Sequence, residues 1–201
     1  ISKSRNFPRY TYDKESLMGD RIDNINSDDD FHYVYAVMHS NTYRTRYAND
    51  LLKDLPRIPD LKGKSEYIRI GKELLDLHLN YESVPALDEV KITGVTEDYR
   101  VKKMKHPKKG ALDTIIYNSD ITITGIPERA YDYVINGRPA IEWIIDQYQV
   151  KTDKKSGIVD DPNEFSDDPK YILNLLLSVI AVSIKTLELI DQLPDFEVID
   201  L

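Results

Sequence analysis

Basic side chains gather most densely between Tyr99 and Lys109, where six of eleven residues are Lys or Arg and none is Asp or Glu. Cationic groups at this density favour contact with phosphate, because charge attraction and hydrogen-bond donation act together. The alternation at the start predicts a strand with Arg100 and Lys102 on one face, leading into a basic turn. A solvated hairpin tip is the alternative. The candidate phosphate ligands are Arg100, Lys102, Lys103, Lys105, Lys108 and Lys109.

A second candidate binding segment is 41–47, in which two arginines and two tyrosines mix at a predicted helix start. Arg44 and Arg46 cannot both face a core, so at least one is available to a partner. An arginine binds guanine with two hydrogen bonds or clamps a phosphate. Pairing of either arginine with Asp50 or Asp54 is the alternative. The candidate nucleic-acid ligands here are Asn41, Thr42, Arg44, Thr45 and Arg46.

Other reactive residue types form no comparable pattern. The four histidines are too scattered to predict a metal site, although His32 and His39 lie seven residues apart on one expected helix face. The loop 151–157 lacks the glycine spacing of a phosphate-binding loop and is predicted to be an ordered connector. Trp143 lies on an apolar stripe and is predicted to be core rather than a base-stacking platform. We therefore expect no catalytic residue, metal or cofactor in this chain.

The composition is that of a globular domain without redox chemistry. The chain has 201 residues, 41% of them hydrophobic, and no cysteine, which excludes disulfides and thiol nucleophiles and fits the cytoplasm. Its net charge of -8 argues against indiscriminate binding to polyanions, but one basic face is still compatible with DNA. The longest apolar run, Tyr171–Ala181, is shorter than the roughly 20 residues that cross a bilayer. The start at Ile1, without a signal peptide, suggests a piece of a longer chain.

The N-terminal third is predicted to be helical. Residues 1–30 show no sustained period and form a leading segment with one short strand at Tyr10–Tyr12. Apolar residues at three- and four-residue spacings over Asp30–Leu55 predict one long helix capped by Asp30, or two helices broken near Ser40. A further helix is predicted over 65–81.

The rest of the chain is predicted to hold a sheet followed by helices. A turn at Asn118–Asp120 joins two of its strands. Pro127, Pro139 and Pro169 each open a helix, and Asn136-Gly137 ends the first of these. The alternating apolar strand segments are 90–93, 99–102, 114–117 and 121–124. The predicted fold class is α+β, with N-terminal helices, a small central antiparallel sheet and a C-terminal helical bundle.

Several longer blocks go beyond composition and periodicity. The sequence reads YVYAVMHSNTYR over 33–44 and LPRIP over 55–59. In these blocks it strongly resembles the C-terminal specificity domain of type ISP single-polypeptide restriction-modification enzymes. The resemblance covers about residues 31–194. It continues in the same order through the blocks 76–82, 98–101, 123–127, 131–138, 142–143 and 148–163.

The resemblance implies a large parent enzyme with a nuclease, an ATPase motor and an adenine methyltransferase, which use Mg, ATP and S-adenosylmethionine. Residues 1–30 would lead from the methyltransferase, and 31–201 would form the target-recognition domain. This domain would recognise a sequence in double-stranded DNA and clamp the duplex against the methyltransferase of the same polypeptide. The catalytic motifs of the parent are absent here, so the chain itself is expected to be no enzyme. The alternative is a docking module that couples methyltransferase and motor without reading bases.

The shared-looking blocks also divide the candidate residues. Residues inside a block fit phosphate contacts, domain docking or internal ion pairs, whereas the set expected to contact DNA lies beside the blocks. The residues inside are Arg44, Arg57, Arg100 and Arg138. The residues beside are Asn41, Thr42, Thr45, Arg46, Lys103, Lys105, His106, Lys108 and Lys109. The turn between Met104 and Leu112 is shorter than the family pattern and contains Pro107, which limits how deeply it would enter a groove.

Overall fold

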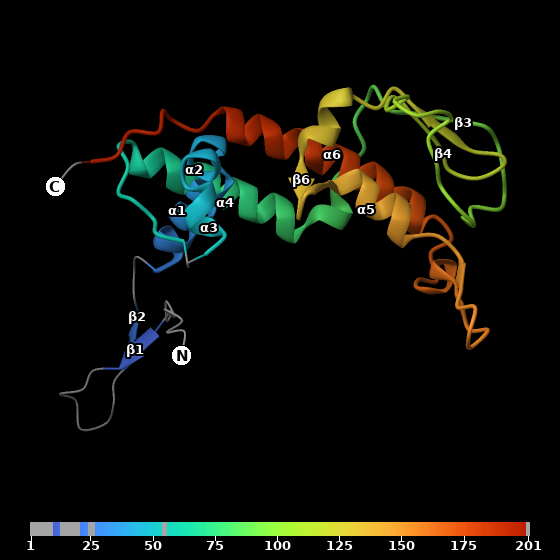
Figure 1. Cartoon of the computed structure of the whole chain (residues 1–201), viewed down its shortest axis with the longest axis horizontal. Coiled ribbons are helices and arrows are strands. Elements are labelled where there is room, and N and C mark those ends of the chain that lie inside the picture. The colour runs from blue at the N-terminus through green and yellow to red at the C-terminus, as the bar shows by residue number, and fades with distance from the viewer. Residues whose placement is uncertain (1–9, 13–20, 24–26, 54–55, 200–201) are drawn as a thin grey trace. The chain divides into compact units, whose positions relative to one another are not determined.

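The computed structural model of the chain describes residues 10–12, 21–23, 27–53 and 56–199 (Figure 1). Its mixture of helices and short antiparallel sheets confirms the predicted α+β class. The chain divides into two compact units. Unit 1 holds the described residues up to Asp76 together with those from Leu189 onward, and unit 2 runs from Leu77 to Glu188.

Unit 1 is mainly helical. The strand predicted at Tyr10–Tyr12 is present as β1 and pairs with β2 (Arg21–Asp23) in antiparallel fashion. Asp30 is not the N-cap of the first helix but lies in its first turn, where acidic side chains stabilise the helix dipole. The helix predicted over 65–81 is confirmed to within two residues. The helices that begin in this unit are α1 (Ser27–His39), α2 (Asn41–Arg46), α3 (Ala48–Leu51) and α4 (Lys64–Leu79), and α4 runs past the unit boundary at Asp76.

Ser40 ends the first helix and caps the next. Its backbone is extended, and its side chain accepts a hydrogen bond from the Tyr43 N–H at 3.3 Å. A serine in this position satisfies an N–H group that would otherwise lack a helical partner. Of the two alternatives for this region, the broken helix is therefore correct.

Buried tyrosines organise the core of unit 1. The Tyr33 hydroxyl donates to the Pro59 carbonyl at 2.7 Å and accepts from the Leu61 N–H at 2.9 Å. The Tyr43 hydroxyl donates to the Arg57 carbonyl at 3.0 Å. These bonds fix the proline-rich connector against α1 and α2. The fully packed members of this core are Tyr33, Ala36, Val37, Tyr43, Leu61 and Tyr67.

Unit 2 contains the predicted small antiparallel sheet, which has three strands in the order β3-β5-β4. One row across it is Ile92, Ile123 and Ile115, of which the last two are buried. The predicted turn is present, with the Asn118 side chain accepting the Ile121 N–H at 2.8 Å. The strands are β3 (Lys91–Thr93), β4 (Thr114–Ile116) and β5 (Thr122–Thr124).

Three sequence predictions in unit 2 are wrong. Residues 99–102 form no strand, and the chain bends at Lys102, because side-chain and loop groups take their backbone hydrogen bonds. Asn136 and Gly137 do not end a helix: both have positive φ, 52° and 79°, and they form a hairpin turn between β6 and β7. Trp143 is 41% exposed, because it lies on the side of α5 opposite the buried Ile141.

The remaining elements are short apart from the last helix. Those before it are η1 (Tyr81–Ser83), η2 (Glu128–Asp132), β6 (Val134–Ile135), β7 (Arg138–Pro139), α5 (Ala140–Gln147), β8 (Lys151–Thr152), β9 (Val159–Asp160) and η3 (Pro162–Glu164). The last helix, α6 (Tyr171–Asp191), is long and apolar enough to cross a membrane by length and composition. However, 67% of its most apolar window is buried inside the protein, as expected of a core helix. Leu176 and Ile180 are fully buried in the core of unit 2.

Candidate nucleic-acid interface

The basic segment 99–109 is held to the body of unit 2 by its apolar residues. The side chains of Val101 and Met104 are buried, each only 1% exposed. The Asn163 side chain holds the Val101 backbone twice, accepting from its N–H and donating to its carbonyl, both at 2.8 Å. The segment is therefore a fixed edge rather than a loose loop.

Further contacts fix the second half of this segment. The Lys105 backbone exchanges two hydrogen bonds with Ile116, of 3.1 and 2.8 Å. The ring of His106 lies 3.0 Å from the Thr114 carbonyl through Nδ1 and 2.9 Å from the Glu142 carboxylate through Nε2. Because both ring nitrogens have partners inside unit 2, His106 has no free nitrogen with which to contact a base.

Five lysines project from this fixed backbone, and we call them the lysine row. All five side chains are exposed. None makes an ion pair or a side-chain hydrogen bond with any residue that the structure describes. Five exposed cations on a fixed backbone have the charge and the order that contact with a row of phosphates requires. The lysine row is Lys102, Lys103, Lys105, Lys108 and Lys109.

Arg100 differs from the lysines because it has an internal partner. Its guanidinium lies 2.6 Å from the Asp161 carboxylate. Hydrogen bonds from the Asn163 side chain and backbone, reinforced by Arg100, lower the pKa of Asp161. Arg100 therefore helps to join the basic segment to the loop that follows β9.

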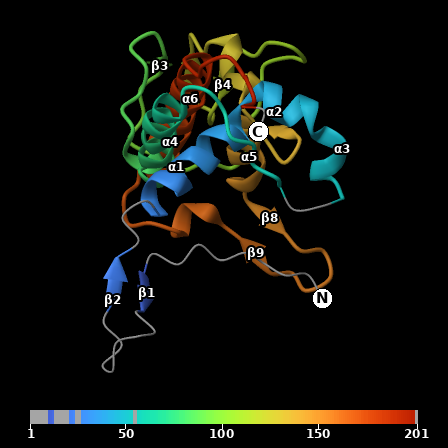
Figure 2. The same ribbon diagram turned by 90° about the vertical axis from the view of Figure 1, so that its left-hand side faces the viewer.

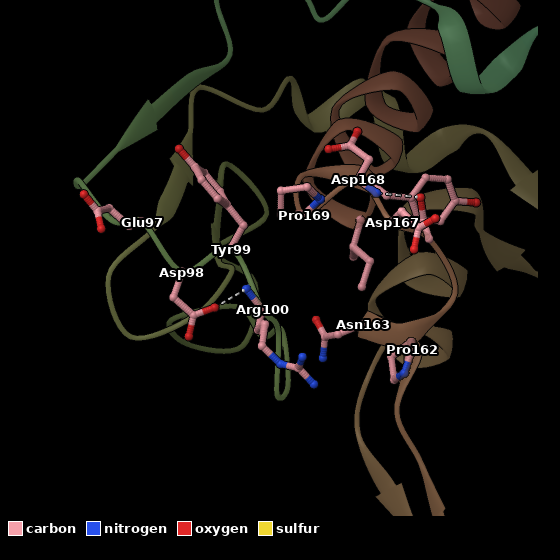
Figure 3. A pocket seen from close by; sticks show the side chains of 12 residues that line it. Glu97, Asp98, Tyr99, Arg100, Pro162, Asn163, Asp167, Asp168 and Pro169 are labelled. Carbon is pink, nitrogen blue, oxygen red and sulfur yellow. Dashed lines mark hydrogen bonds between the residues drawn. The ribbon is translucent and has the colours of Figure 1, made fainter.

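A pocket of about 330 Å³ lies beside Arg100. Figure 3 shows Asp98 and Arg100 on one side of it and Asn163 and Asp168 on the other. The carboxylates that line this pocket oppose a phosphate, and its arginine is already paired. We assign the pocket no part in DNA contact. Its lining is Glu97, Asp98, Tyr99, Arg100, Pro162, Asn163, Ser166, Asp167, Asp168, Pro169, Tyr171 and Ile172.

The second predicted segment forms helix α2 in unit 1. Its one buried residue, Tyr43, fixes the helix to the core. Neither Arg44 nor Arg46 pairs with Asp50 in the described structure, and the Arg46 guanidinium lies 5.9 Å from the Tyr47 ring centre. Asp54 lies outside the described residues. The five candidate residues are all exposed: Asn41, Thr42, Arg44, Thr45 and Arg46.

The predicted site residues thus fall into two groups, the lysine row in unit 2 and the polar face of α2 in unit 1. Asn163 was absent from the predicted set although it positions the basic segment. No local pattern indicates its role, since its partner lies 62 positions away in the sequence. Among the described residues there is no group of three His, Cys, Asp or Glu side chains that would hold a metal ion.

Comparison with known proteins defines the class. The type ISP C-terminal specificity domain family matches residues 1–175, and the chain belongs to this family. A search of curated proteins finds no match.

The relatives with solved structures include restriction-modification enzymes. The type ISP enzyme LlaGI, solved as a nuclease-deletion mutant with a DNA substrate mimic, is 70% identical over 96% of this chain, with a TM-score of 0.85. The ATP-dependent type ISP enzyme LlaBIII, solved bound to DNA, is 58% identical over 94% of the chain, also with a TM-score of 0.85. A DrdV–DNA complex is 27% identical over 94%, with a TM-score of 0.74. The chain spans only 15%, 13% and 21% of these three proteins.

Proposed function

We propose that this domain recognises the DNA target of a type ISP restriction-modification enzyme. Its family membership and its likeness to LlaBIII, which was solved bound to DNA, support the proposal. The observation that carries it is the lysine row: five exposed cations on a backbone fixed by Val101, Met104 and Asn163. In a chain of net charge -8, a row of exposed cations without carboxylate partners among the described residues is a surface suited to an anion.

We assign the two groups of residues different tasks. The lysine row contacts phosphates and sets the position of the duplex, because an ammonium group is a compact point charge that suits the phosphate backbone. The exposed face of α2 contributes Asn41, Thr42, Thr45 and Arg46 to base edges, and Arg44 to phosphate. Arg100, held by Asp161, positions the basic segment.

The wider enzyme is part of the same proposal. Duplex DNA lies between this domain and the adenine methyltransferase of the same polypeptide, so that the clamp holds the duplex while the target adenine is flipped. S-adenosylmethionine, ATP and Mg serve the other domains, and this domain contributes no catalytic group. The proposed location is the cytoplasm, where the enzyme meets DNA.

The competing function is a docking module that couples the methyltransferase and the motor without reading bases. An exchange experiment separates the two. This domain is replaced, in the full polypeptide, by the corresponding domain of a type ISP enzyme with a different target, and the methylated sequence is determined. Target recognition predicts that the methylated sequence follows the domain, whereas a docking module predicts that it stays with the methyltransferase.

A further inference from the structure

The hairpin formed by β8 and β9 exposes every residue from Lys151 to Asp160. Its strands pair Lys151 with Asp160 and Thr152 with Val159. In Figure 1 and Figure 2 the hairpin, coloured orange, extends away from α5 and α6 of the same unit. The sequence predicted only an ordered connector here, so the hairpin has no assigned role.

The tip of this hairpin is internally rigid. One Asp153 carboxylate oxygen accepts the N–H groups of Lys155 and Ser156 at 2.9 and 2.7 Å, and the Ser156 hydroxyl at 2.9 Å. These bonds lower the pKa of Asp153, led by the bond from the Ser156 backbone. Gly157 supplies the positive φ of 72° that the turn needs. A turn fixed in advance pays little entropy when it binds.

Residues at both ends of the hairpin contact the basic segment. The Val150 N–H, just before β8, donates to the Lys102 carbonyl at 2.9 Å. Asp161, just after β9, pairs with Arg100 at 2.6 Å. The hairpin therefore extends from the edge that carries the lysine row.

The exposed surface of the hairpin combines apolar and cationic groups. Ile158 is 68% exposed and Val159 is 57% exposed. The hairpin contains three lysines and two aspartates, and Asp153 accepts hydrogen bonds within the turn. The lysines are Lys151, Lys154 and Lys155.

We propose that the β8–β9 hairpin enters a groove of the DNA duplex, with Ile158 and Val159 against base edges and Lys154 and Lys155 on the flanking phosphates. The inference rests on the proposed DNA-recognition function and adds a reading element to it. A two-stranded ribbon fits the major groove, where apolar side chains contact the thymine methyl group. Continuity with the lysine row makes DNA the occupant that the charges favour over a protein surface.

The test compares three variants of the full polypeptide in binding to a panel of randomised duplexes. The first carries Ile158→Ser and Val159→Ser, and the second Lys154→Ala and Lys155→Ala. The matched control is Val95→Ser, a valine that is 97% exposed elsewhere in unit 2. All changed side chains are exposed, and thermal unfolding checks that each variant folds. In a fourth variant, Ile158→Cys carries a photocrosslinker that reports contact with a base directly, because Ile158 is the side chain proposed to reach base edges.

The first variant is expected to lose about 10-fold or more in affinity for the preferred sequence, because two apolar side chains no longer become buried against the DNA, and to relax that preference. The second is expected to bind all sequences more weakly to the same extent. The slope of log affinity against log salt concentration (the salt slope) should become smaller by about two. The proposal for the hairpin alone is overturned if both variants bind DNA unchanged and no crosslink forms, while lysine-row variants lose affinity. Loss of enzyme activity with unchanged DNA binding also overturns it, because the hairpin then docks on protein. If the unchanged protein shows no sequence preference at all, the proposed function itself fails.

Discussion

The side-chain amide of Asn163 forms two hydrogen bonds with the backbone of Val101, both of 2.8 Å. This pair of bonds ties the basic segment to the loop after β9, so one amide positions both. Val101 is almost fully buried, and its N–H and carbonyl groups have lost access to water.

Replacement of Asn163 by Ala is expected to lower the free energy of unfolding by about 1–3 kcal/mol, because it leaves buried backbone groups without partners. Chemical denaturation measures this loss. The control is Asn174→Ala, since Asn174 is exposed on α6 and should tolerate alanine. Equal stability of the two variants would contradict the role given to Asn163.

Gly71 permits the close approach of α4 and α1 in unit 1. A Cβ at this position would lie 1.9 Å from the His32 carbonyl oxygen, and no helix can absorb that overlap without moving. Gly71→Ala should therefore destabilise the protein by about 1–3 kcal/mol, even though alanine is the better helix former. Thermal unfolding of this variant beside Ser65→Ala, an exposed change in the same helix, tests the point. A stability equal to or above that of the unchanged protein would show that the helices are not so close.

His39 is expected to make unit 1 less stable in mild acid. Burial lowers the pKa of His39, and its Nδ1 donates to the Tyr35 carbonyl at 2.7 Å. A lowered pKa means that the unfolded chain takes up the proton first. Stability should therefore fall as the pH drops below the ordinary histidine pKa, by at most about 1.4 kcal/mol per pH unit for this group.

Denaturant unfolding at a series of pH values from 7.5 to 5, about the range in which histidines titrate, measures this slope. His39→Gln should be less stable at neutral pH but should show a shallower slope. An unchanged slope in that variant would assign the acid sensitivity to other groups.

The two arginines of α2 should behave differently. Arg46→Ala is expected to relax the preference at one base position by about 1–3 kcal/mol, whereas Arg44→Ala should weaken all sequences alike. Binding of each variant of the full polypeptide to a panel of single-base variants of the target gives the comparison. Lys72→Ala, an exposed change on α4, serves as the control. Identical profiles for the two arginine variants would remove α2 from base reading.

Local signals predicted part of this fold. The helix over 64–79 followed from the spacing of its apolar residues, and the turn at Asn118 from its sequence. The strand expected at 99–102 was wrong because alternation also describes a segment whose partner is a distant side chain. Trp143 was misplaced because the apolar stripe of α5 was taken to be wider than the buried face.

The candidate site also combines features that the local sequence predicts with features that depend on distant residues. The density of basic residues along the sequence was enough to predict the lysine row, because a cluster of lysines can be identified without knowledge of tertiary contacts. The internal ion pair of Arg100 and the fixed ring of His106 depend on residues 61 and 36 positions away, which no local pattern reveals.

We propose that the lysine row holds DNA. The most direct test of this proposal is the binding of the full polypeptide to randomised duplexes over a range of salt concentrations. The unchanged protein is compared with a variant in which Lys103, Lys105, Lys108 and Lys109 become Ala, and with a control that changes Lys72 and Lys91. We expect the four-residue variant alone to bind more weakly, with a salt slope smaller by up to about four and an unchanged sequence preference. Unchanged affinity and salt slope in that variant would contradict the account.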